Sequence, residues 1–437
     1  MCGSVRPGRP QRRAAGASTP DRIPVILLTS RLALALYSCL LVAGQATAQA
    51  RPTVGVMGQA IGIVTRVDPI PGGGTLTEAR LVQPLLMLHA QALGGRLRAV
   101  ATLNLEGQTI PDGELTPGSW GEGFNDRRHP HTYAHELMLT AGGAVGRWAR
   151  VAVSGGKGFV PFGSDDPMSR PALRYPVNHH LAQILERAVL MAGVRAGPVA
   201  LEGAVFNGDE PERPGQWPRG DRFGDSWAAR LTVIPVPGVE LSGSRARVHS
   251  PEHRPGAGTD AWKWHVAAQV ERPLAGGELY ALGEWARTEE GLGFFVFRSL
   301  LAEVAWRRGP HRPYYRFERS DRPEDLRTVD LFRSDRPHLE NAILGTTRFT
   351  LHTIGYLHDR PLAAGRLRLQ PFVEGTFGTA RTVDGGLLTP EILYGGSGVR
   401  SLSAGLRISW RVEGHRMGRY GGLLAPPGDV EHAGHPE

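Results

Sequence analysis

The amino-acid sequence predicts an all-β fold, a transmembrane antiparallel β-barrel of about 16 strands with short periplasmic turns and long extracellular loops. Three observations predict this fold. Apolar residues recur at every second position along much of the chain after residue 50. The connections between these segments alternate between short and long. No later segment approaches the roughly 18 uninterrupted apolar residues that a membrane-spanning helix needs.

The two-residue period is clearest in residues 401–411. Leu402, Leu406 and Ile408 fall on one face of an extended chain, while Arg407 and Ser409 fall on the other. Such alternation means that one face of a strand meets an apolar medium and the other meets water. Because lipid offers no hydrogen bonds, strands can cross it only in a closed barrel that pairs every backbone group. We therefore predict strands with hydrocarbon outside and solvent inside.

Segments of this kind recur along the whole chain, and their even number suits a closed antiparallel barrel with both ends on one side of the membrane. We place the strands at 54–66, 80–93, 96–106, 133–143, 147–156, 186–196, 198–207, 226–236, 238–248, 262–272, 277–288, 293–307, 311–319, 344–358, 365–379 and 399–412.

The connections supply the second observation, because a soluble β-sandwich has no reason to alternate short and long connections strictly. Short turns are expected at 93–95, 142–146, 196–197, 235–238, 274–277, 308–310 and 360–365. Long polar loops are expected at 107–132, 157–185, 208–225, 249–261, 320–343 and 380–398. Short turns on one side and long loops on the other are typical of bacterial outer-membrane barrels.

The chain is expected to have three parts: a cleaved signal peptide at 1–50, the barrel at 51–412 and a polar C-terminal tail at 413–437. The apolar stretch 32–43 follows an arginine-rich leader and ends in the small-x-small sequence Ala48-Gln49-Ala50. Two alternatives fit less well. In a lipoprotein signal ending at Cys39, apolar residues would not continue past the cysteine. In twin-arginine export, Arg12-Arg13 would lie closer to the apolar stretch.

The charge distribution argues against a nucleic-acid partner. The formal net charge is +8, but six arginines and one aspartate in the first fifty residues carry +5 of it, which leaves +3 for the rest. No block rich in Lys and Arg follows residue 50. Both cysteines, Cys2 and Cys39, lie in the leader. The mature chain therefore has neither a disulfide nor a thiolate metal site.

A barrel of this size is wide enough to leave an aqueous channel. The side chains opposite the apolar rows are candidates for its lining, and both signs of charge are present. The candidate pore-lining residues are Arg230, Arg316, Glu318, Arg348, Arg368, Glu374 and Arg407. A slight excess of arginine predicts a mild preference for anions. In the alternative interpretation these charges hydrate the pore and pair with one another, since selectivity is set at the narrowest ring.

Two histidine-rich segments form a second candidate site. Their possible metal ligands are His129, His131, His135, Glu136, His179 and His180. Imidazole and carboxylate groups bind Zn²⁺, Cu²⁺ or Ni²⁺, and the two segments flank one predicted hairpin, so we expect them to meet at one barrel mouth. Hydrogen-bonded loop packing is the alternative. The chain has neither His-Glu-x-x-His nor Gly-x-Ser-x-Gly. We therefore expect no enzymatic activity, and no cofactor apart from this transition metal.

The segment 153–166 resembles a pattern in phosphate-selective-porin-like barrels, in which a strand runs into Pro-Phe-Gly and an acidic residue. The matching positions are Gly156, Lys157, Pro161, Phe162, Gly163 and Asp165. The segments 126–136 and 178–186 are similar to uncharacterised porin-like proteins of Gram-negative bacteria. The resemblance implies an outer-membrane pore. Phosphate selectivity does not carry over, because the lysine-rich lumen of such porins is missing: Lys157 and Lys263 are the only lysines.

The sequence thus predicts an outer-membrane porin-like channel for passive diffusion of small hydrophilic solutes or ions. Its expected partners are outer-membrane lipid, these solutes, and further copies of the same chain in a homo-oligomer such as a trimer. Two alternatives remain open. One is a metal-binding transport or accessory barrel that uses the histidine-rich loops. The other is a secreted soluble β-protein, which would turn its leucine and tryptophan rows inward to make a dry core.

Overall fold

A computed structural model describes residues 52–70, 72–110, 131–211, 214–249, 260–325, 343–384, 386–411, 416–420 and 423. The expected signal peptide at 1–50 lies outside these residues. All described residues belong to one compact unit, Ala50–Glu437.

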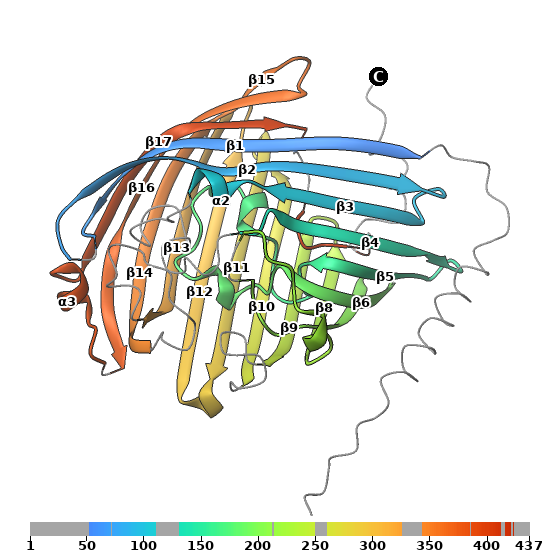
Figure 1. Cartoon of the computed structure of the whole chain (residues 1–437). Coiled ribbons are helices and arrows are strands. Elements are labelled where there is room, and N and C mark those ends of the chain that lie inside the picture. The colour runs from blue at the N-terminus through green and yellow to red at the C-terminus, as the bar shows by residue number, and fades with distance from the viewer. Residues whose placement is uncertain are drawn as a thin grey trace, which may run out of the picture. The chain divides into compact units, whose positions relative to one another are not determined.

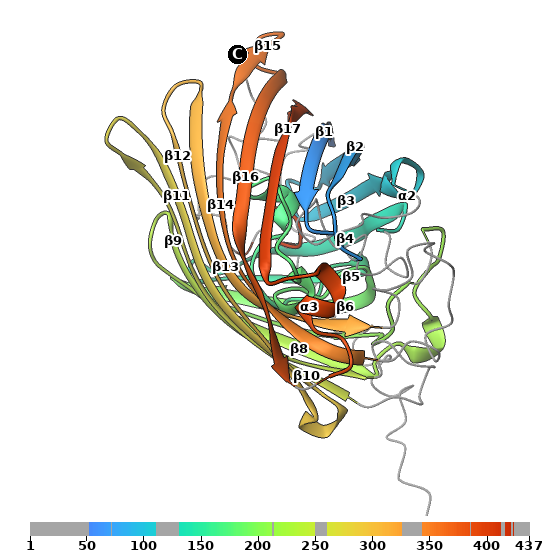
Figure 2. The ribbon, with the colours of Figure 1, turned by 90° about the vertical axis from the view of Figure 1, so that its left-hand side faces the viewer.

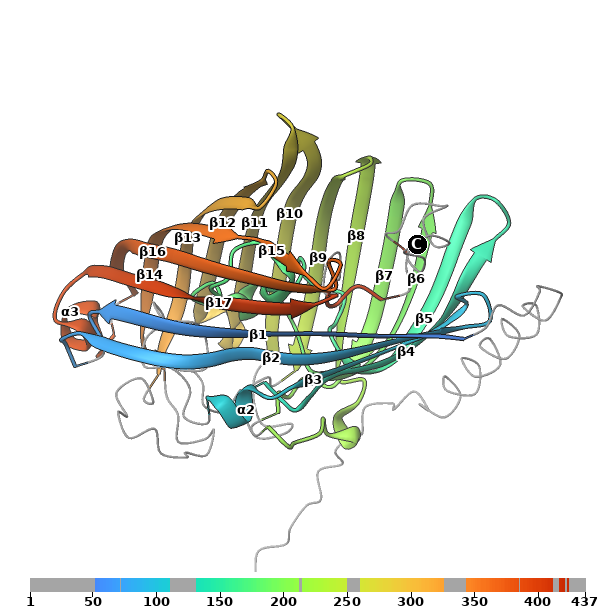
Figure 3. The same ribbon diagram turned by 90° about the horizontal axis from the view of Figure 1, so that it is seen from above.

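The described strands form a single antiparallel sheet that closes on itself (Figure 1). The strands are β1 (Thr53–Asp68), β2 (Leu76–Ala92), β3 (Leu97–Asn104), β4 (Ala134–Val145), β5 (Ala149–Gly158), β6 (Arg187–Ala196), β7 (Val199–Phe206), β8 (Ser226–Val236), β9 (Val239–His249), β10 (Asp260–Leu274), β11 (Gly277–Glu290), β12 (Phe295–Arg307), β13 (His311–Asp325), β14 (Ile343–His358), β15 (Arg360–Leu362), β16 (Leu367–Asp384) and β17 (Gly398–Trp410). Each strand pairs with its neighbours in sequence, and β1 pairs with both β2 and β17. In Figure 3 the first and last strands, blue and red, lie side by side and complete the ring.

Sixteen strands surround the barrel, and we call them staves. The short β15 is not counted separately, because it only extends β14 past a break at Asp359. Both β14 and β15 pair with the same strand, β16. Each of the sixteen predicted segments corresponds to one stave. The predicted antiparallel barrel with an even number of strands is confirmed.

Short helices occur only between the strands of the described chain. They are α2 (Glu106–Thr109), η1 (Pro167–Ser169), η2 (His179–Leu181), η3 (Gly220–Arg222), η4 (Gly291–Gly293) and α3 (Pro390–Tyr394). Among the described residues, no helix is both long enough and apolar enough to cross a membrane.

The two ends of the barrel differ in the length of their connections. At one end, which we call the turn end, the chain reverses within a few residues. The link between β10 and β11 is only Ala275 and Gly276, whose positive φ angles of 50° and 72° suit a two-residue hairpin. At the opposite end, the loop end, the connections include the 28 residues between β5 and β6 at 159–186.

Many of the described strands carry opposite chemistry on their two faces. In β7, Val199, Leu201 and Val205 are exposed on the outside of the barrel, while Glu202 is buried on the inside. The same holds in β17, whose leucines face out and whose serines and Arg407 face in. The soluble alternative needs the apolar rows to turn inward. The described strands have the reverse arrangement.

The interior of the barrel is occupied by the 159–186 connection, which we call the inward loop. It lies within the ring of strands, in green in Figure 2. Its Leu173 packs with Ile61, Val82 and Leu357 of the wall in one buried cluster. Its Phe162 belongs to a second cluster that includes wall residues of several staves. The loop therefore packs its apolar side chains against apolar residues of the inner wall.

Candidate functional site: the barrel lumen

Buried ion pairs fasten the inward loop to the wall. Arg174 of the loop donates to Glu318 of β13, and the amide of Val177 donates to the same carboxylate at 2.9 Å. Arg170 lies 3.4 Å from Glu284 and 3.6 Å from Glu303. All five charged side chains are buried. Removing one partner would leave an uncompensated buried charge, so each pair holds the loop in its inward position.

Six of the seven predicted pore-lining residues are on the inner face. Arg230, Arg316, Glu318, Arg368, Glu374 and Arg407 alternate with exposed outer residues along their strands. Each faces a partner rather than open lumen. Arg230 bonds to Glu202 at 2.7 Å, and Arg316 bonds to Glu303 at 2.7 Å. Glu374 accepts from Tyr314 at 2.8 Å, Arg407 donates to Gln59 at 2.7 Å, and Arg368 pairs with Asp359. Their charges are largely matched within the protein.

The prediction for Arg348, the seventh candidate, is wrong, because this residue does not face the lumen. The inner positions of β14 are Phe349 and Leu351, which are buried against Val177 of the inward loop and the region of α3. Arg348 lies on the outer face, where it pairs with Asp321 at 2.6 Å. The assignment failed because it took polarity as the mark of the inside, and at β14 the inside is filled with apolar residues of the loop.

The sequence pattern did not predict three further arginines on the inner face. Arg98 of β3, Arg150 of β5 and Arg195 of β6 lie on the inner face near the turn end, and Arg150 stands directly opposite Arg195 in the sheet register. Arg98 donates to the Gly95 carbonyl at 3.0 Å. Among the described residues, Arg150 has no carboxylate partner, and its buried Nε has no hydrogen-bond partner. Alanine and valine occur on both faces of these short strands, so the strands show no clear alternation that would place the arginines on the inner face.

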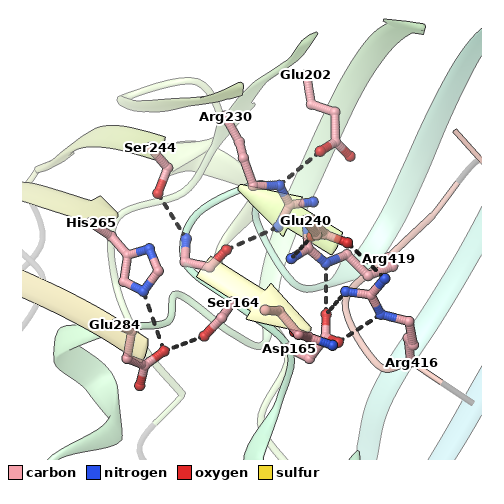
Figure 4. Close-up of polar contacts among 12 residues, drawn as sticks. Ser164, Asp165, Glu202, Arg230, Glu240, Ser244, His265, Glu284, Arg416 and Arg419 are labelled. Atoms are coloured by element: carbon pink, nitrogen blue, oxygen red, sulfur yellow. Dashed lines mark hydrogen bonds and ion pairs between the residues drawn. The ribbon is translucent and has the colours of Figure 1, made fainter. Parts of the chain in front are cut away.

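A segment of the predicted C-terminal tail lies inside the barrel, among the residues in Figure 4. Arg416 contacts Asp165 of the inward loop at 2.6 Å and Glu240 of β9 at 2.9 Å. Arg419 contacts the same two carboxylates at 2.8 and 3.1 Å. Two cations and two anions therefore join the tail, the inward loop and the wall. No sequence pattern predicts that these four residues meet, since up to 254 positions separate them.

A compact group of metal-ligand types lies where the inward loop ends. His131, His135 and Glu186 offer ligand atoms that are all within 4.8 Å of one another. The His135 Nδ1 is 2.6 Å from a Glu186 carboxylate oxygen, and the His131 Nδ1 is 3.7 Å from it. Burial alone would lower the pKa of His131, but its bond to Glu186 and the carboxylates of Glu106, Glu186 and Asp166 raise that pKa to about 9. Burial would raise the pKa of Glu186, but His131 and His135 hold that pKa well below its usual range.

The other predicted metal ligands are distributed around this group. His129 lies outside the described residues. The His179 ring stacks on His131 with a centroid distance of 6.3 Å, and His180 lies 3.8 Å from Glu210. Glu136 points into the lumen, where it accepts bonds from Thr102 at 2.7 Å and Tyr420 at 2.6 Å. The pairing of β3 with β4 shifts register at His135, so the histidine and Glu136 make separate contacts.

A closed antiparallel barrel with apolar residues outside and charged residues inside has the architecture of outer-membrane β-barrels. The sequence matches no protein-family model and no curated protein. Among solved structures, the chain is similar to an anion-selective porin from Comamonas acidovorans, with 12% identity over 82% of this chain and 100% of that one and a TM-score of 0.47. OmpT of Vibrio cholerae, in a trimer form, shows 11% identity over 83% and 100% of the two chains, with a TM-score of 0.47. OprB of Pseudomonas putida shows 12% over 86% and 96%, with a TM-score of 0.47.

Proposed function

We propose that this chain is an outer-membrane, porin-like channel through which small hydrophilic solutes or ions diffuse. The observation that carries the proposal is the closed barrel with apolar rows outside and polar rows inside. Lipid around such a barrel meets hydrocarbon side chains, and every strand finds a partner, so no unpaired sheet edge faces the membrane. A polar inner wall gives hydrated solutes a path that lipid does not.

Two groups of outward tryptophans support the membrane setting. Trp306 and Trp410 lie at the turn end of their strands, and Trp227, Trp262 and Trp264 lie near the loop end. Trp227 and Trp262 are in edge-to-face contact at 6.1 Å. Tryptophan prefers the interface between hydrocarbon and headgroups, so barrels that span a membrane have an aromatic girdle at each interface. Their spacing along the staves fits one girdle at each end.

We further propose that the channel prefers anions. The support is the arginine group Arg98, Arg150 and Arg195, which lies in the lumen near the turn end. Most of the other inner arginines face carboxylates, whereas Arg150 has none among the described residues. The dielectric constant inside a narrow pore is lower than in bulk water. A positive charge that has no carboxylate partner there attracts anions and repels cations.

Conductance of single channels in planar bilayers tests both proposals. The full chain should form discrete conducting steps, and a salt gradient should give a reversal potential of the sign for anion flow. Arg150→Ala should shift that potential toward cation flow. Arg400→Ala removes an exposed arginine paired with Asp68 and serves as the control with no shift. Absence of any conducting steps, even when residues 413–437 are deleted, would refute the channel. An unchanged potential in Arg150→Ala would refute the role of the arginine group.

The second candidate function is binding of a transition metal ion by His131, His135 and Glu186. Their close approach favours it. Zn²⁺ with ligands at about 2.0–2.1 Å in a tetrahedron needs ligand atoms about 3.3–3.5 Å apart, and the His131 and Glu186 atoms are already 3.7 Å apart. A bound ion would join β4 to the end of the inward loop.

Calorimetric titration of the purified full chain with Zn²⁺ or Ni²⁺ tests the metal site. One site at micromolar metal is expected, and Glu186→Gln and His131→Gln should each abolish it or weaken it at least tenfold. His352→Gln is the matched control, because His352 lies on the outer face against Phe377. Equal binding in all three variants would assign the metal to other histidines and refute the site.

A further inference from the structure

We infer that the C-terminal segment represented by residues 416–420 and Leu423 is an intramolecular plug. It occupies the lumen from the turn end and holds the inward loop in place, so free passage requires its withdrawal. This inference rests on the proposed channel function and adds its regulation. Three independent features of the described residues support it: the route of the chain, the ion pairs and the apolar fit.

The chain has to turn back to reach the lumen. β17 ends at Trp410, which pairs with Gly58 of β1 and Leu367 of β16, at the turn end of the barrel. Ten residues later, the Tyr420 hydroxyl donates to Glu136 at 2.6 Å and accepts from the Phe159 amide at 3.1 Å. Glu136 is an inner residue of β4, and Phe159 begins the inward loop. The tail is therefore inserted between the wall and the loop.

The ion pairs bind this segment to both surfaces at once. Asp165 belongs to the inward loop and Glu240 to the wall, and each carboxylate contacts both Arg416 and Arg419. Asp165 is buried. The nearby arginines Arg170 and Arg230 have their own carboxylate partners, Glu284 and Glu303 for Arg170 and Glu202 for Arg230. The tail thus supplies the charge that makes the inward position of Asp165 stable.

The apolar side chains of the tail fill space in the same place. Met417 and Tyr420 are buried in one cluster with Met138 and Phe159. Gly418 has a φ of +77°, and a Cβ at this position would lie 3.0–3.2 Å from the Phe159 side chain. Only glycine lets the tail pass this close to the loop without strain. These contacts show that the described part of the tail is closely packed against the inward loop.

The plug also reaches the arginine group proposed to attract anions. The carbonyl of Leu423 accepts a bond from the Arg195 Nη1 at 2.9 Å, and the Leu423 side chain lies against Gly193 on the same strand. With the tail in place, Leu423 covers Arg195, so a solute that enters from the turn end contacts Leu423 instead of the arginine. Withdrawal of the tail would therefore uncover the arginine group and remove the support of the inward loop in one step.

A comparison of the full chain with a chain that ends at Val412 tests the plug in planar bilayers. The shortened channel should show a several-fold larger conductance and a longer open time. Equal conductance of both chains would overturn the plug and leave the channel proposal intact. Silence of both, with both shown to be folded barrels, would instead overturn the proposed channel. Heat-modifiable migration in electrophoresis establishes that each chain is folded.

Charge reversal tests the same inference without shortening the chain. Arg416→Glu combined with Arg419→Glu should raise the conductance toward that of the shortened chain, because the tail then repels Asp165 and Glu240. Adding Asp165→Arg and Glu240→Arg restores opposite charges and should bring the conductance back down. A structural defect alone would not be reversed by two further substitutions. If the variant with all four substitutions has the same conductance as the variant with two, the ion pairs do not keep the tail in the lumen.

Discussion

The hydroxyl of Tyr420 donates a 2.6 Å hydrogen bond to the carboxylate of Glu136, across 284 positions of the sequence. Glu136 has one other side-chain donor among the described residues, Thr102, at 2.7 Å. This contact ties the C-terminal tail to an inner position of β4, in addition to the ion pairs that tie the tail to Glu240 of β9. The lumen is therefore organised around three layers: wall, inward loop and tail.

Tyr420→Phe is expected to weaken the attachment of the tail. The substitution keeps the ring that packs beside Phe159 but removes the hydrogen bond, which leaves a buried carboxylate with one donor fewer. The cost expected for such a loss is about 1–3 kcal/mol. Limited proteolysis measures it: the tail of the variant should be cut several-fold faster than that of the native chain. Tyr356→Phe, on the exposed outer face, is the control and should change nothing.

Acid should release the tail. Although burial raises the pKa of Asp165, the charges and hydrogen bonds of Arg416 and Arg419 hold that pKa well below the usual 3.8. A lowered folded pKa contributes stability that is present above pH 3.8 and is lost as pH falls through the folded value. Glu240, Arg170, Arg230 and Glu202 are the other charged groups that interact with this cluster. Conductance should rise at the acid end of the titration and stay low near neutral pH.

Asp165→Asn separates this titration from others in the lumen. The variant has no carboxylate to protonate at this position, so its conductance should already be raised at neutral pH and should lack the acid transition. An identical acid transition in the variant and the native chain would assign the change to another group and contradict the prediction.

The strands were predictable from sequence because their signal is local. Alternation within about ten residues is enough to find a stave, as in β17, and the inner positions of Glu318 and Arg407 followed from it. Arg348 shows the limit. Its face depends on Leu351 packing against a loop residue, Val177, far away in sequence. Polarity cannot reveal which inner positions a folded-in loop will cover.

The candidate site was less predictable for the same reason. The two histidine-rich segments do lie together, since His131 stacks near His179. Glu186, the partner of His131 and His135, belongs to the second segment but has no spacing that marks it as a ligand. The contacts of Arg416 and Arg419 with Asp165 join positions 251 and 254 residues apart that do not pair in the sheet. No periodic pattern encodes such contacts, and only the folded lumen brings them together.

The pair His131 and Glu186 should give the stability of the barrel a second pH dependence. The pKa of His131 is raised from 6.5 to about 9, so its contribution is full below pH 6.5 and is lost as pH rises through 9. The pKa of Glu186 is lowered from 4.5, so its contribution is present above pH 4.5 and is lost as pH falls. Melting temperature should be highest between these limits. In Glu186→Gln the melting temperature should depend less on pH on both the acid and the alkaline side of this maximum. In His352→Gln the pH dependence should be unchanged.

A disulfide between the tail and the inward loop should form when Gly418→Cys is combined with Phe159→Cys. A Cβ at position 418 would lie 3.1 Å from the Phe159 Cβ, slightly closer than the roughly 3.5–4.5 Å of disulfides, so the tail has to move away by a few tenths of an ångström. Phe159→Cys removes the ring that crowds this position, and the positive φ of residue 418 costs a non-glycine residue about 1–2 kcal/mol, which the disulfide has to offset. The only native cysteines, Cys2 and Cys39, lie in the expected signal peptide, so the new pair should have no competitor. Mild oxidation should join the two positions in folded protein, and a fragment cut between them should stay attached until reductant is added. The combination of Gly418→Cys with Ala275→Cys, at an outer turn, is the control that should not cross-link. Failure of the first pair to form in a folded barrel would mean that the tail does not lie beside the inward loop.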